Sequence, residues 1–428
     1  MKKIKRIIAF SGSVALVASL GLSACSGRSG EESAKSSVTW STWGNPEELK
    51  VFENFNKKFE KSNTGITVNF QPVASYDDYH SKLNTQLTSK TAPDVFYVGD
   101  DQIAAMISNG VLEPAETCLK LDGADLRKED FSQSLYRVGE KDGILYALPN
   151  DVNPDAFFFD RNALKAAGIS EDPVELAKNN QWTFDKFFEM TRKLKNAGLE
   201  GAAFWNYWAT WQSILSANGS PAYSESGEFI GNQPAAIEGL QKWADKFADG
   251  HLLIADELPE GSDSDTLFVT HKLGFMVQGR YTVATVLGAG LDATSYDVVR
   301  WPTRSGAEEP TGVAASFLAV NKNAKDKESA CKLFNAFLNK DGQTLRLKDN
   351  GNALPSIKGI DNLVTDAGVP SNVQALISMR DLGFSNSPVE ASVPGLSSEI
   401  ATNLILPLFK GNLSAKDALG SIASQLKN

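Results

Sequence analysis

Residues that commonly bind metals are scarce in this chain. It contains three histidines and three cysteines in 428 residues, and no two histidines stand at the spacing that would place both on one helix face. No metal site and no cofactor are therefore expected.

Two of the cysteines, Cys118 and Cys331, lie far apart in the sequence. Oxidising conditions outside the cell permit a bridge, but spacing alone does not establish one. We favour two small, buried apolar side chains over a disulfide.

Motifs that mark common catalytic sites are also missing. The sequence has no Gly-x-Ser-x-Gly nucleophile elbow, no His-Glu-x-x-His motif and no Walker phosphate loop. A GAGLDA stretch at Gly288 and Gly290 matches a dinucleotide-binding turn only weakly and is interpreted as a loop. A secreted glycosidase needs two carboxylates about 5 to 9.5 Å apart, and 52 acidic residues leave that alternative open. We expect a binding protein rather than an enzyme.

The first 24 residues have the layout of an export signal, because lysines and an arginine precede an apolar stretch that ends at Leu22. That stretch is short and contains serine, whereas a spanning helix needs about 20 apolar residues. The sequence LSAC, ending at Cys25, looks like a bacterial lipobox. We expect a signal peptide over 1–24, a lipidated Cys25 on the outer face of the cell membrane, and a flexible tether over 25–37.

The chain is acidic, with a formal net charge of −10. Loss of a cationic signal makes the remainder more acidic still. This charge argues against nucleic acid or anionic lipid as a partner. Membrane contact then comes from acyl chains, of which two give stable anchoring.

Strand and helix patterns alternate from Val38 onward. They predict strands over 38–44, 66–73 and 93–100, separated by helices over 46–62 and 76–90. This order predicts an α/β fold with a doubly wound parallel sheet, in which ligands bind at the carboxyl ends of the strands. Later patterns predict a strand running into a helix over 156–168, helices over 183–198, 237–250 and 327–340, strands over 274–280 and 316–323, and a largely helical segment from Val373 onward.

Several segments, taken in order, resemble extracellular carbohydrate-binding proteins of ABC importers, of the maltose-binding type. The resemblance spans essentially the whole chain after the signal. The segments that carry it are VTWSTWG, PDVFYVGD, YALPNDVNPDAFFFDRNALKAAG, WTFDKF, GFMVQGRY, SFLAVNKNAKDKESACKLFNAFLNKDGQ and GNALP. One departure is NTGITVNF, which lacks the proline common before the second strand.

The resemblance implies a two-lobed Venus-flytrap fold that closes on its ligand by hinge bending. It implies one lobe over 38–148 and 311–349 and a second over 149–310 and 350–428, with hinge crossings at YALPND and PTGVAAS. The implied partners are a carbohydrate ligand and the permease subunits of an importer, and a monomer is expected.

Sugars offer apolar ring faces fringed by hydroxyl groups, so a cleft that binds them needs flat aromatic surfaces and planar polar side chains, which the fold places at strand ends. Trp43 and Asn45 follow the first predicted strand, and Tyr76 follows the second. For Trp43 the alternative is a core position like that of Trp40, and for Tyr76 it is packing at a helix start.

The segment FWNYWATWQ gathers Trp205, Tyr207, Trp208 and Trp211, more large rings than a core usually needs in one place. We expect Trp205 or Trp208 to stack on sugar. If the segment is helical, Trp208 and Trp211 could instead share a buried face.

Polar candidates follow the third strand and occupy the first crossing. Asp100, Asp101 and Gln102 could accept hydrogen bonds from sugar hydroxyls or could cap the next helix. Asn150, Asp151 and Asn153 are assigned equally to binding and to turn formation near Pro154.

In GFMVQGRY, Arg280 or Tyr281 stands where the family places a ligand-contacting aromatic residue. The alternative for Arg280 is an ion pair. The candidate loops carry more acids than bases, which argues against a polyanionic ligand and leaves a polyamine open. Their aromatic side chains, combined with Asn, Gln and Asp, favour a neutral sugar. A polyol phosphate, a polyamine or a peptide is the alternative ligand.

Overall fold

The computed structural model describes residues 36–44, 46–224, 226–259, 261–348, 351–393 and 395–426. The predicted signal peptide, Cys25 and most of the predicted tether lie outside these residues, as does Asn45. Strand β1 begins at Ser36, so the fold starts two residues earlier than the tether prediction placed it.

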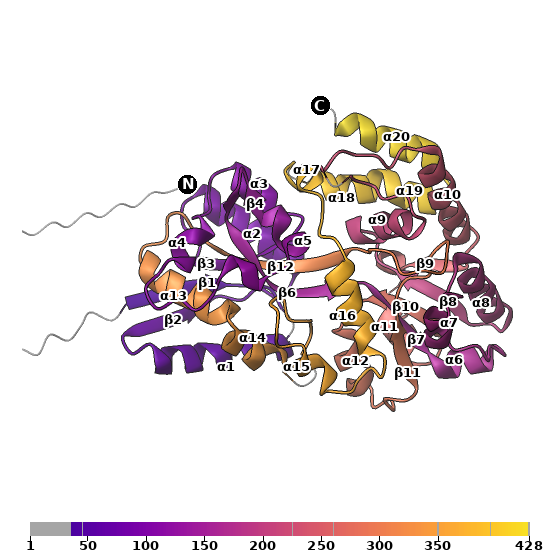
Figure 1. Cartoon of the computed structure of the whole chain (residues 1–428), viewed down its shortest axis with the longest axis horizontal. Helices are drawn as coiled ribbons and strands as arrows, with labels where there is room; N and C mark the ends of the chain where they lie inside the picture. The colour runs from indigo at the N-terminus through magenta and orange to yellow at the C-terminus, as the bar shows by residue number, and fades with distance from the viewer. Residues whose placement is uncertain are drawn as a thin grey trace, which may run out of the picture. The chain divides into compact units, whose positions relative to one another are not determined.

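The first lobe is built on a mixed five-stranded sheet in the order β2-β1-β3-β12-β6 (Figure 1). Its strands are β1 (Ser36–Ser41), β2 (Ile66–Phe70), β3 (Val95–Gly99), β6 (Ala147–Pro154) and β12 (Val313–Val320). β1 pairs with β2 and β3 in parallel, as predicted. β12 runs antiparallel to both β3 and β6, so the prediction of a wholly parallel sheet is wrong. The early strands alone could not show this, because β12 and β6 come from distant segments.

Helices cover this sheet where apolar periodicity predicts them. In α1 (Pro46–Ser62), Phe52, Phe55 and Phe59 recur at three- and four-residue steps, and all three are buried. Helix α2 (Tyr76–Thr88) has Ser75 as its N-cap residue, whose hydroxyl accepts from the Asp78 backbone N–H. The helices α13 (Lys327–Leu338) and α14 (Lys340–Leu347) complete the layer beside α1.

The second lobe has its own five-stranded sheet, in the order β11-β7-β10-β8-β9. Its strands are β7 (Ala156–Asp160), β8 (Glu200–Phe204), β9 (Leu252–Ile254), β10 (Leu273–Gln278) and β11 (Tyr296–Val299). Its larger helices are α8 (Phe184–Asn196), α9 (Trp208–Ala217) and α10 (Pro234–Ala248). β7 and β10 are buried along their whole length, which explains their continuous apolar sequences.

Shorter elements fill the connections. In the first lobe these are α3 (Ile103–Ser108), α4 (Ala115–Leu119), η1 (Lys128–Asp130), α5 (Gln133–Tyr136), η2 (Arg137–Gly139), β4 (Glu140–Lys141) and β5 (Ile144–Leu145). In the second they are α6 (Arg161–Ala166), α7 (Pro173–Lys178), η3 (Ala255–Glu257), α11 (Ser264–Val269) and α12 (Thr282–Gly288). The GAGLDA stretch forms the end of α12 and the turn after it, as the loop interpretation expects.

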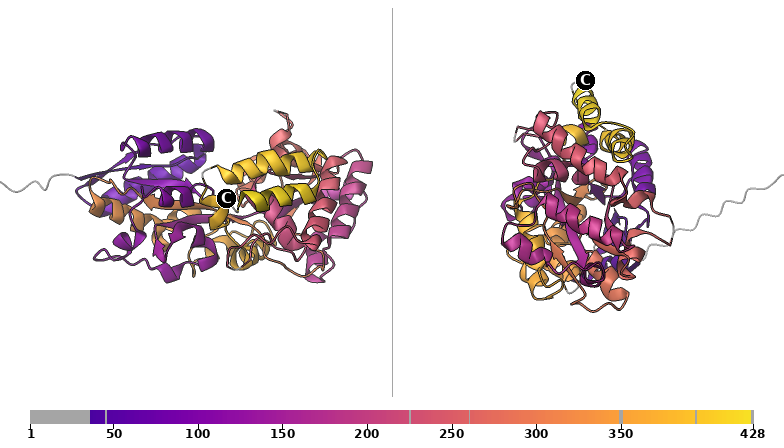
Figure 2. Two further views of the ribbon diagram at one scale, coloured as in Figure 1. Left: turned by 90° about the horizontal axis from the view of Figure 1, so that it is seen from above. Right: turned by 90° about the vertical axis from the view of Figure 1, so that its right-hand side faces the viewer.

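The segment from Val373 onward is largely helical, as predicted. It contains α16 (Val373–Leu382), α17 (Pro388–Ala391), α18 (Leu396–Ile400), the π-helical η4 (Ala401–Ile405), α19 (Leu406–Phe409) and α20 (Ala415–Gln425), after the short α15 (Asn362–Thr365). The C-terminal helices α19 and α20, yellow in Figure 2, pack against α10.

Within the residues that the structure describes, the chain passes between the two sheets three times. Asp155 alone separates β6 from β7, and residues 300–312 connect β11 to β12. The third passage follows α14, where Leu354 forms a β-bridge with Val152. Helix α16 then contacts both β6 and β11.

Cys118 and Cys331 form a disulfide that joins α4 to α13, with their Cα atoms 4.6 Å apart. The preference for two unlinked side chains is therefore wrong. The two helices pack against each other, and this proximity across 213 residues could not be seen from spacing.

Candidate ligand-binding site

Aromatic side chains gather at the carboxyl ends of β1 and β3 in the first lobe. Trp43 lies edge-on to Tyr76, with ring centroids 4.9 Å apart, and also contacts Tyr79, His80 and Tyr97. Trp43 is only partly buried and Tyr76 is 36% exposed. Trp40, three residues earlier in β1, is fully buried, and its indole N–H donates to Asn56 over 2.9 Å, so it belongs to the core.

The Tyr76 hydroxyl donates to Oδ1 of Asp101, and Gln102 Nε2 donates to Oδ2 of the same carboxylate over 2.9 Å. Gly99 makes this arrangement possible, since a Cβ there would overlap the Tyr76 hydroxyl and lie 2.7 Å from Asp101 Oδ1. The three predicted residues Tyr76, Asp101 and Gln102 therefore form one connected polar group beside Trp43.

The helix-cap alternative for the acidic pair is wrong. Gln102 is the N-cap residue of α3, and no side chain caps that helix. The two aspartates instead have different environments. Asp101 accepts a hydrogen bond from the Tyr76 hydroxyl, whereas the Asp100 side chain is buried.

Asp100 joins the two lobes. Its Oδ2 accepts from the Ala315 backbone N–H on β12 over 2.9 Å, and its Oδ1 accepts from Nε1 of Trp208 on α9 over 3.2 Å. Burial, together with the nearby Asp101, raises the pKa of Asp100 to about 8, although both donors oppose the rise. Both oxygens are thus engaged by the protein.

The four aromatic residues around the start of α9 have different environments. Trp205 is 38% exposed, whereas Trp208 and Trp211 are 3% and 0% exposed within the helix. The helical alternative, in which Trp208 and Trp211 are buried together, matches these values. Only Trp205 therefore presents an indole face to the surface in this arrangement.

Tyr207 donates its hydroxyl proton to Oδ2 of Asp155, the residue between the two sheets. The Asp155 carbonyl accepts from Trp301 Nε1 over 2.6 Å, which fixes the passage to the second lobe. Burial raises the pKa of Asp155 to about 7, with the Tyr207 bond acting in the opposite direction. Sequence patterns did not single out Asp155, because a lone aspartate after a proline has no distinctive signal.

Asn150, Asp151 and Asn153 lie in strand β6, so the turn alternative is wrong for all three. Asp151 and Asn153 pair with Ser316 and Ala314 of β12, whose distant sequence gave no sign of this register, and Asn150 lies at the irregularity between the pairs made by Asp151 and Pro149. Asn153 accepts from the Arg280 backbone N–H over 2.9 Å.

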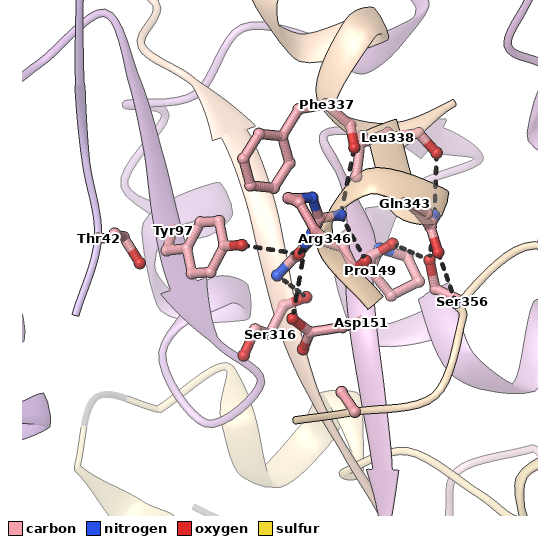
Figure 3. A network of polar contacts seen from close by, with 12 residues as sticks. Thr42, Tyr97, Pro149, Asp151, Ser316, Phe337, Leu338, Gln343, Arg346 and Ser356 are labelled. Carbon is pink, nitrogen blue, oxygen red and sulfur yellow. Dashed lines mark hydrogen bonds and ion pairs between the residues drawn. The ribbon is translucent and has the colours of Figure 1, made fainter. Parts of the chain in front are cut away.

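Asn150 and Asp151 belong to a buried polar network around Arg346 (Figure 3). Arg346 Nη1 donates to Asn150 Oδ1 over 2.8 Å, and Tyr97 donates to the same oxygen over 2.8 Å. The guanidinium also lies 3.9 Å from the centre of the Phe337 ring. Burial raises the pKa of Asp151 to about 6 even though Arg346, 4.0 Å away, opposes the rise.

The same network fixes the third passage between the lobes. Gln343 Nε2 donates to Ser356 Oγ over 2.8 Å, and that hydroxyl donates to the Pro149 carbonyl over 2.6 Å (Figure 3). Helix α14, strand β6 and the segment at Ser356 are therefore held together next to the first passage. Sequence reasoning did not identify Arg346, whose surroundings come from three distant segments.

Arg280 and Tyr281 follow β10 and differ sharply in exposure. Arg280 is 0% exposed, and its guanidinium donates to the carbonyls of Gly351 and Ala353 in the third passage. Tyr281 is 39% exposed. A Cβ at Gly279 would lie 2.7 Å from the Tyr281 ring and 2.8 Å from Asn153, so glycine is needed for this close approach.

Two residues near the site had no sequence signal. The Phe384 ring lies 6.4 Å from that of Trp208, and Phe384 forms a β-bridge with Gly312. Glu390 is fully buried and accepts from Gln212 over 3.1 Å and from Tyr223 over 2.8 Å. Burial raises the pKa of Glu390.

The described residues lack the features of a metal site or a membrane-spanning helix. There, no group of three or more His, Cys, Asp or Glu side chains is placed to hold a metal ion. In the same part of the chain, no helix combines the length and apolarity needed to cross a bilayer. Two grooves of about 470 and 540 Å³ lie on the second lobe near α20 and contain none of the site residues described above.

Two α/β lobes connected by three passages, with aromatic and acidic side chains between them, define the class of two-lobed solute-binding proteins. The chain belongs to the bacterial extracellular solute-binding protein family, whose model matches residues 43–344. Since this family is extracellular, the chain is exported. The sequence prediction of family and fold is confirmed.

Individual proteins support the same grouping. A binding protein of Brucella abortus (strain 2308) is 24% identical over 315 residues, which cover 70% of this chain and 71% of the relative. The sn-glycerol-3-phosphate-binding periplasmic protein of Rhizobium meliloti (strain 1021) is 21% identical and covers 67% of each chain. An ABC substrate-binding protein from Listeria monocytogenes, solved in complex with cycloalternan, has a TM-score of 0.78 at 21% identity and covers 92% of this chain and 98% of its own.

Proposed function

We propose that this protein is the solute-binding component of an ABC importer and captures a neutral sugar or oligosaccharide between its lobes. The observation that carries the proposal is the set of partly exposed aromatic side chains near the contact between the lobes. Tyr76 lies beside Trp43 in the first lobe, and Trp205 and Tyr281 lie in the second. Flat aromatic surfaces of this kind suit the apolar faces of sugar rings.

We assign ligand contact to the exposed or partly exposed candidates Trp43, Tyr76, Asp101, Gln102, Trp205, Tyr207 and Tyr281. The other candidates hold the two lobes and their passages in place. Asp100, Asn150, Trp208 and Arg280 are buried, whereas Asp151 and Asn153 are partly buried and contact Arg346 and the Arg280 backbone. The division follows burial for the first four, because an enclosed side chain has few groups left for a ligand; for Asp151 and Asn153 it follows these contacts.

The lobe ranges, 38–148 with 311–349 and 149–310 with 350–428, remain part of the proposal. β1, β2, β3 and β12 fall within the first set, β7 to β11 within the second, and β6 spans the boundary between them. Hinge bending would be absorbed where the sheets connect, at Asp155 and in residues 300–312.

A thermal-shift screen against mono-, di- and trisaccharides and larger glucans tests the ligand class. A ligand that binds only the folded protein raises the melting temperature by mass action. We expect at least one uncharged saccharide to do so. A screen in which no saccharide raises the melting temperature would contradict the proposal.

A phosphorylated polyol is the second candidate, because the Rhizobium meliloti relative is a sn-glycerol-3-phosphate-binding protein. A bound phosphate calls for cationic donors. The candidate site instead contains Asp100, Asp101 and Asp155, and the guanidinium of Arg280 donates to backbone carbonyls. Including sn-glycerol-3-phosphate in the screen separates the two ligand classes.

We also propose that Cys25 carries a diacyl anchor, that the monomer delivers its ligand to a membrane permease, and that no covalent chemistry occurs. Replacing Cys25 by Ser should release the protein from membranes, which fractionation and mass spectrometry can measure. Product formation on incubation with oligosaccharides would instead favour the glycosidase alternative.

A further inference from the structure

Two adjacent aromatic residues at the start of α9 act as hydrogen-bond donors in different directions. Tyr207 donates to Asp155, between the two sheets, and Trp208 donates to Asp100, which follows β3 in the first lobe. Helix α9 belongs to the second lobe, where it packs against α10. The bond between Trp208 and Asp100 is therefore a direct side-chain link from one lobe to the other.

The acceptor end of this link is fixed by its own lobe. Asp100 Oδ2 accepts from the Ala315 N–H on the neighbouring strand β12 over 2.9 Å, and the side chain is only 6% exposed. One oxygen is thus anchored to the sheet, and the other is directed at the indole. A carboxylate oxygen held in place in this way loses little conformational entropy when it accepts a second donor.

The donor end is equally fixed. A Cβ at Gly312 would lie 2.7 Å from Ala209 and 3.2 Å from the Trp208 ring, so the passage from β11 to β12 runs directly against the first turn of α9. The Gly312 N–H donates to Ser213 Oγ over 2.8 Å, which holds that passage to the same helix. Any motion that separates the lobes must either break the Trp208–Asp100 bond or disturb this packing.

We propose that the Trp208–Asp100 hydrogen bond is a latch that holds the lobes together in the absence of ligand, with Asp100 as the positioning residue for Trp208. This inference rests on the proposed function, since it assumes lobes that open and close around a solute. A latch of this kind raises the fraction of protein already in the closed arrangement. Ligand affinity rises with that fraction, because less of the binding free energy is spent on closure.

The test compares two conservative variants of the same helix by small-angle X-ray scattering of the purified, ligand-free protein. Trp208→Phe removes the N–H donor and keeps an aromatic ring. Trp211→Phe is the matched control, since Trp211 is fully buried three residues further along and its Nε1 has no hydrogen-bond partner in the structure. We expect Trp208→Phe to raise the ratio of open to closed protein by about two- to tenfold, the range that one hydrogen bond provides, and to increase the radius of gyration.

Asp100→Ala provides a second, independent variant, because it removes the acceptor from the opposite lobe. It should open the protein as Trp208→Phe does, and Trp211→Phe should leave the radius of gyration unchanged. Circular dichroism establishes that each variant is folded before scattering is measured. Equal radii of gyration for the parent and for both latch variants would overturn the latch.

Failure of the latch and failure of the proposed function give different results. If no saccharide binds the parent protein but the latch variants still open, the assignment to sugar binding is wrong and the latch stands. If saccharides bind and the latch variants stay closed without ligand, the sugar assignment stands and the latch is wrong.

Discussion

The Trp208 indole nitrogen donates to Oδ1 of Asp100 over 3.2 Å, across the contact between the two lobes. This single bond changes the roles that the sequence suggests for both residues. Each was a candidate for sugar contact, and each is buried with its polar atoms engaged by the protein. Trp205, three residues before Trp208, is the member of this aromatic segment that stays exposed.

Alanine substitutions should therefore separate Trp205 from Trp208. Trp205→Ala removes exposed aromatic area and should weaken saccharide binding by about 1–3 kcal/mol with little change in stability. Isothermal titration calorimetry and urea unfolding measure the two quantities. Undiminished affinity would remove Trp205 from the site.

Trp208→Ala should act mainly on the fold. The indole is buried against Gly312, and loss of a buried tryptophan costs about 3–5 kcal/mol of unfolding free energy. Urea unfolding of this variant should show that loss even without ligand. A variant as stable as the parent would contradict the buried position of Trp208.

Gly99→Ala should displace the Tyr76 side chain from Asp101, because the added methyl group would occupy the position of the Tyr76 hydroxyl. We expect weaker saccharide binding, measured by calorimetry. Gly420→Ala is the control, since Gly420 lies in helix α20 with nothing within 4 Å of an added Cβ. Equal affinities for the two variants would show that the Tyr76–Asp101 pair does not support ligand binding.

The disulfide should contribute to stability and leave the ligand site unchanged. Replacing Cys118 and Cys331 together by Ala removes a cross-link between positions 213 residues apart and should lower the free energy of unfolding by about 2–4 kcal/mol. Urea unfolding measures this change, and calorimetry should give the parent's affinity. Unaltered stability would indicate that the bridge is not formed in the protein.

Stability should fall as pH rises because of the two buried carboxyl groups between the lobes. Burial raises the pKa of Asp100 to about 8 and that of Asp155 to about 7, from an ordinary value of 3.8 in both cases. Since the folded-state values lie above those of the unfolded chain, folding takes up protons. Their stabilising effect is complete below about pH 4 and is lost as pH rises through 7 and 8.

Urea unfolding of the parent and of the Asp100→Asn, Asp155→Asn double variant, measured between pH 5 and 9, tests this expectation. The double variant should show a shallower decline with pH, because Asn does not titrate. Identical slopes for the two proteins would show that these carboxyl groups do not take up protons on folding.

Much of the fold could be predicted from the sequence because its signals are local. The periodic phenylalanines of α1 and the continuous apolar residues of β3 identify those elements without knowledge of their neighbours. The antiparallel entry of β12 beside β3 and the pairing of Cys118 with Cys331 depend on segments more than 200 residues apart. No local pattern specifies such contacts.

For the candidate site, the sequence could indicate which strand ends and which aromatic segment would contribute residues. Tyr76, Asp101 and Gln102 do come together, because parallel strands bring their carboxyl ends to one edge. Sequence could not tell which ring of the α9 segment is buried, since helix phase and the position of Gly312 decide that. Asp155 and Arg346 gain their importance only from where the passages between lobes lie.

Isothermal titration calorimetry of the purified protein with cycloalternan, linear malto-oligosaccharides and sn-glycerol-3-phosphate is the most direct test of the central claim. We predict saturable binding of one uncharged oligosaccharide per protein molecule and no heat of binding with the phosphate ester. Binding of the phosphate ester without binding of any neutral saccharide would contradict it.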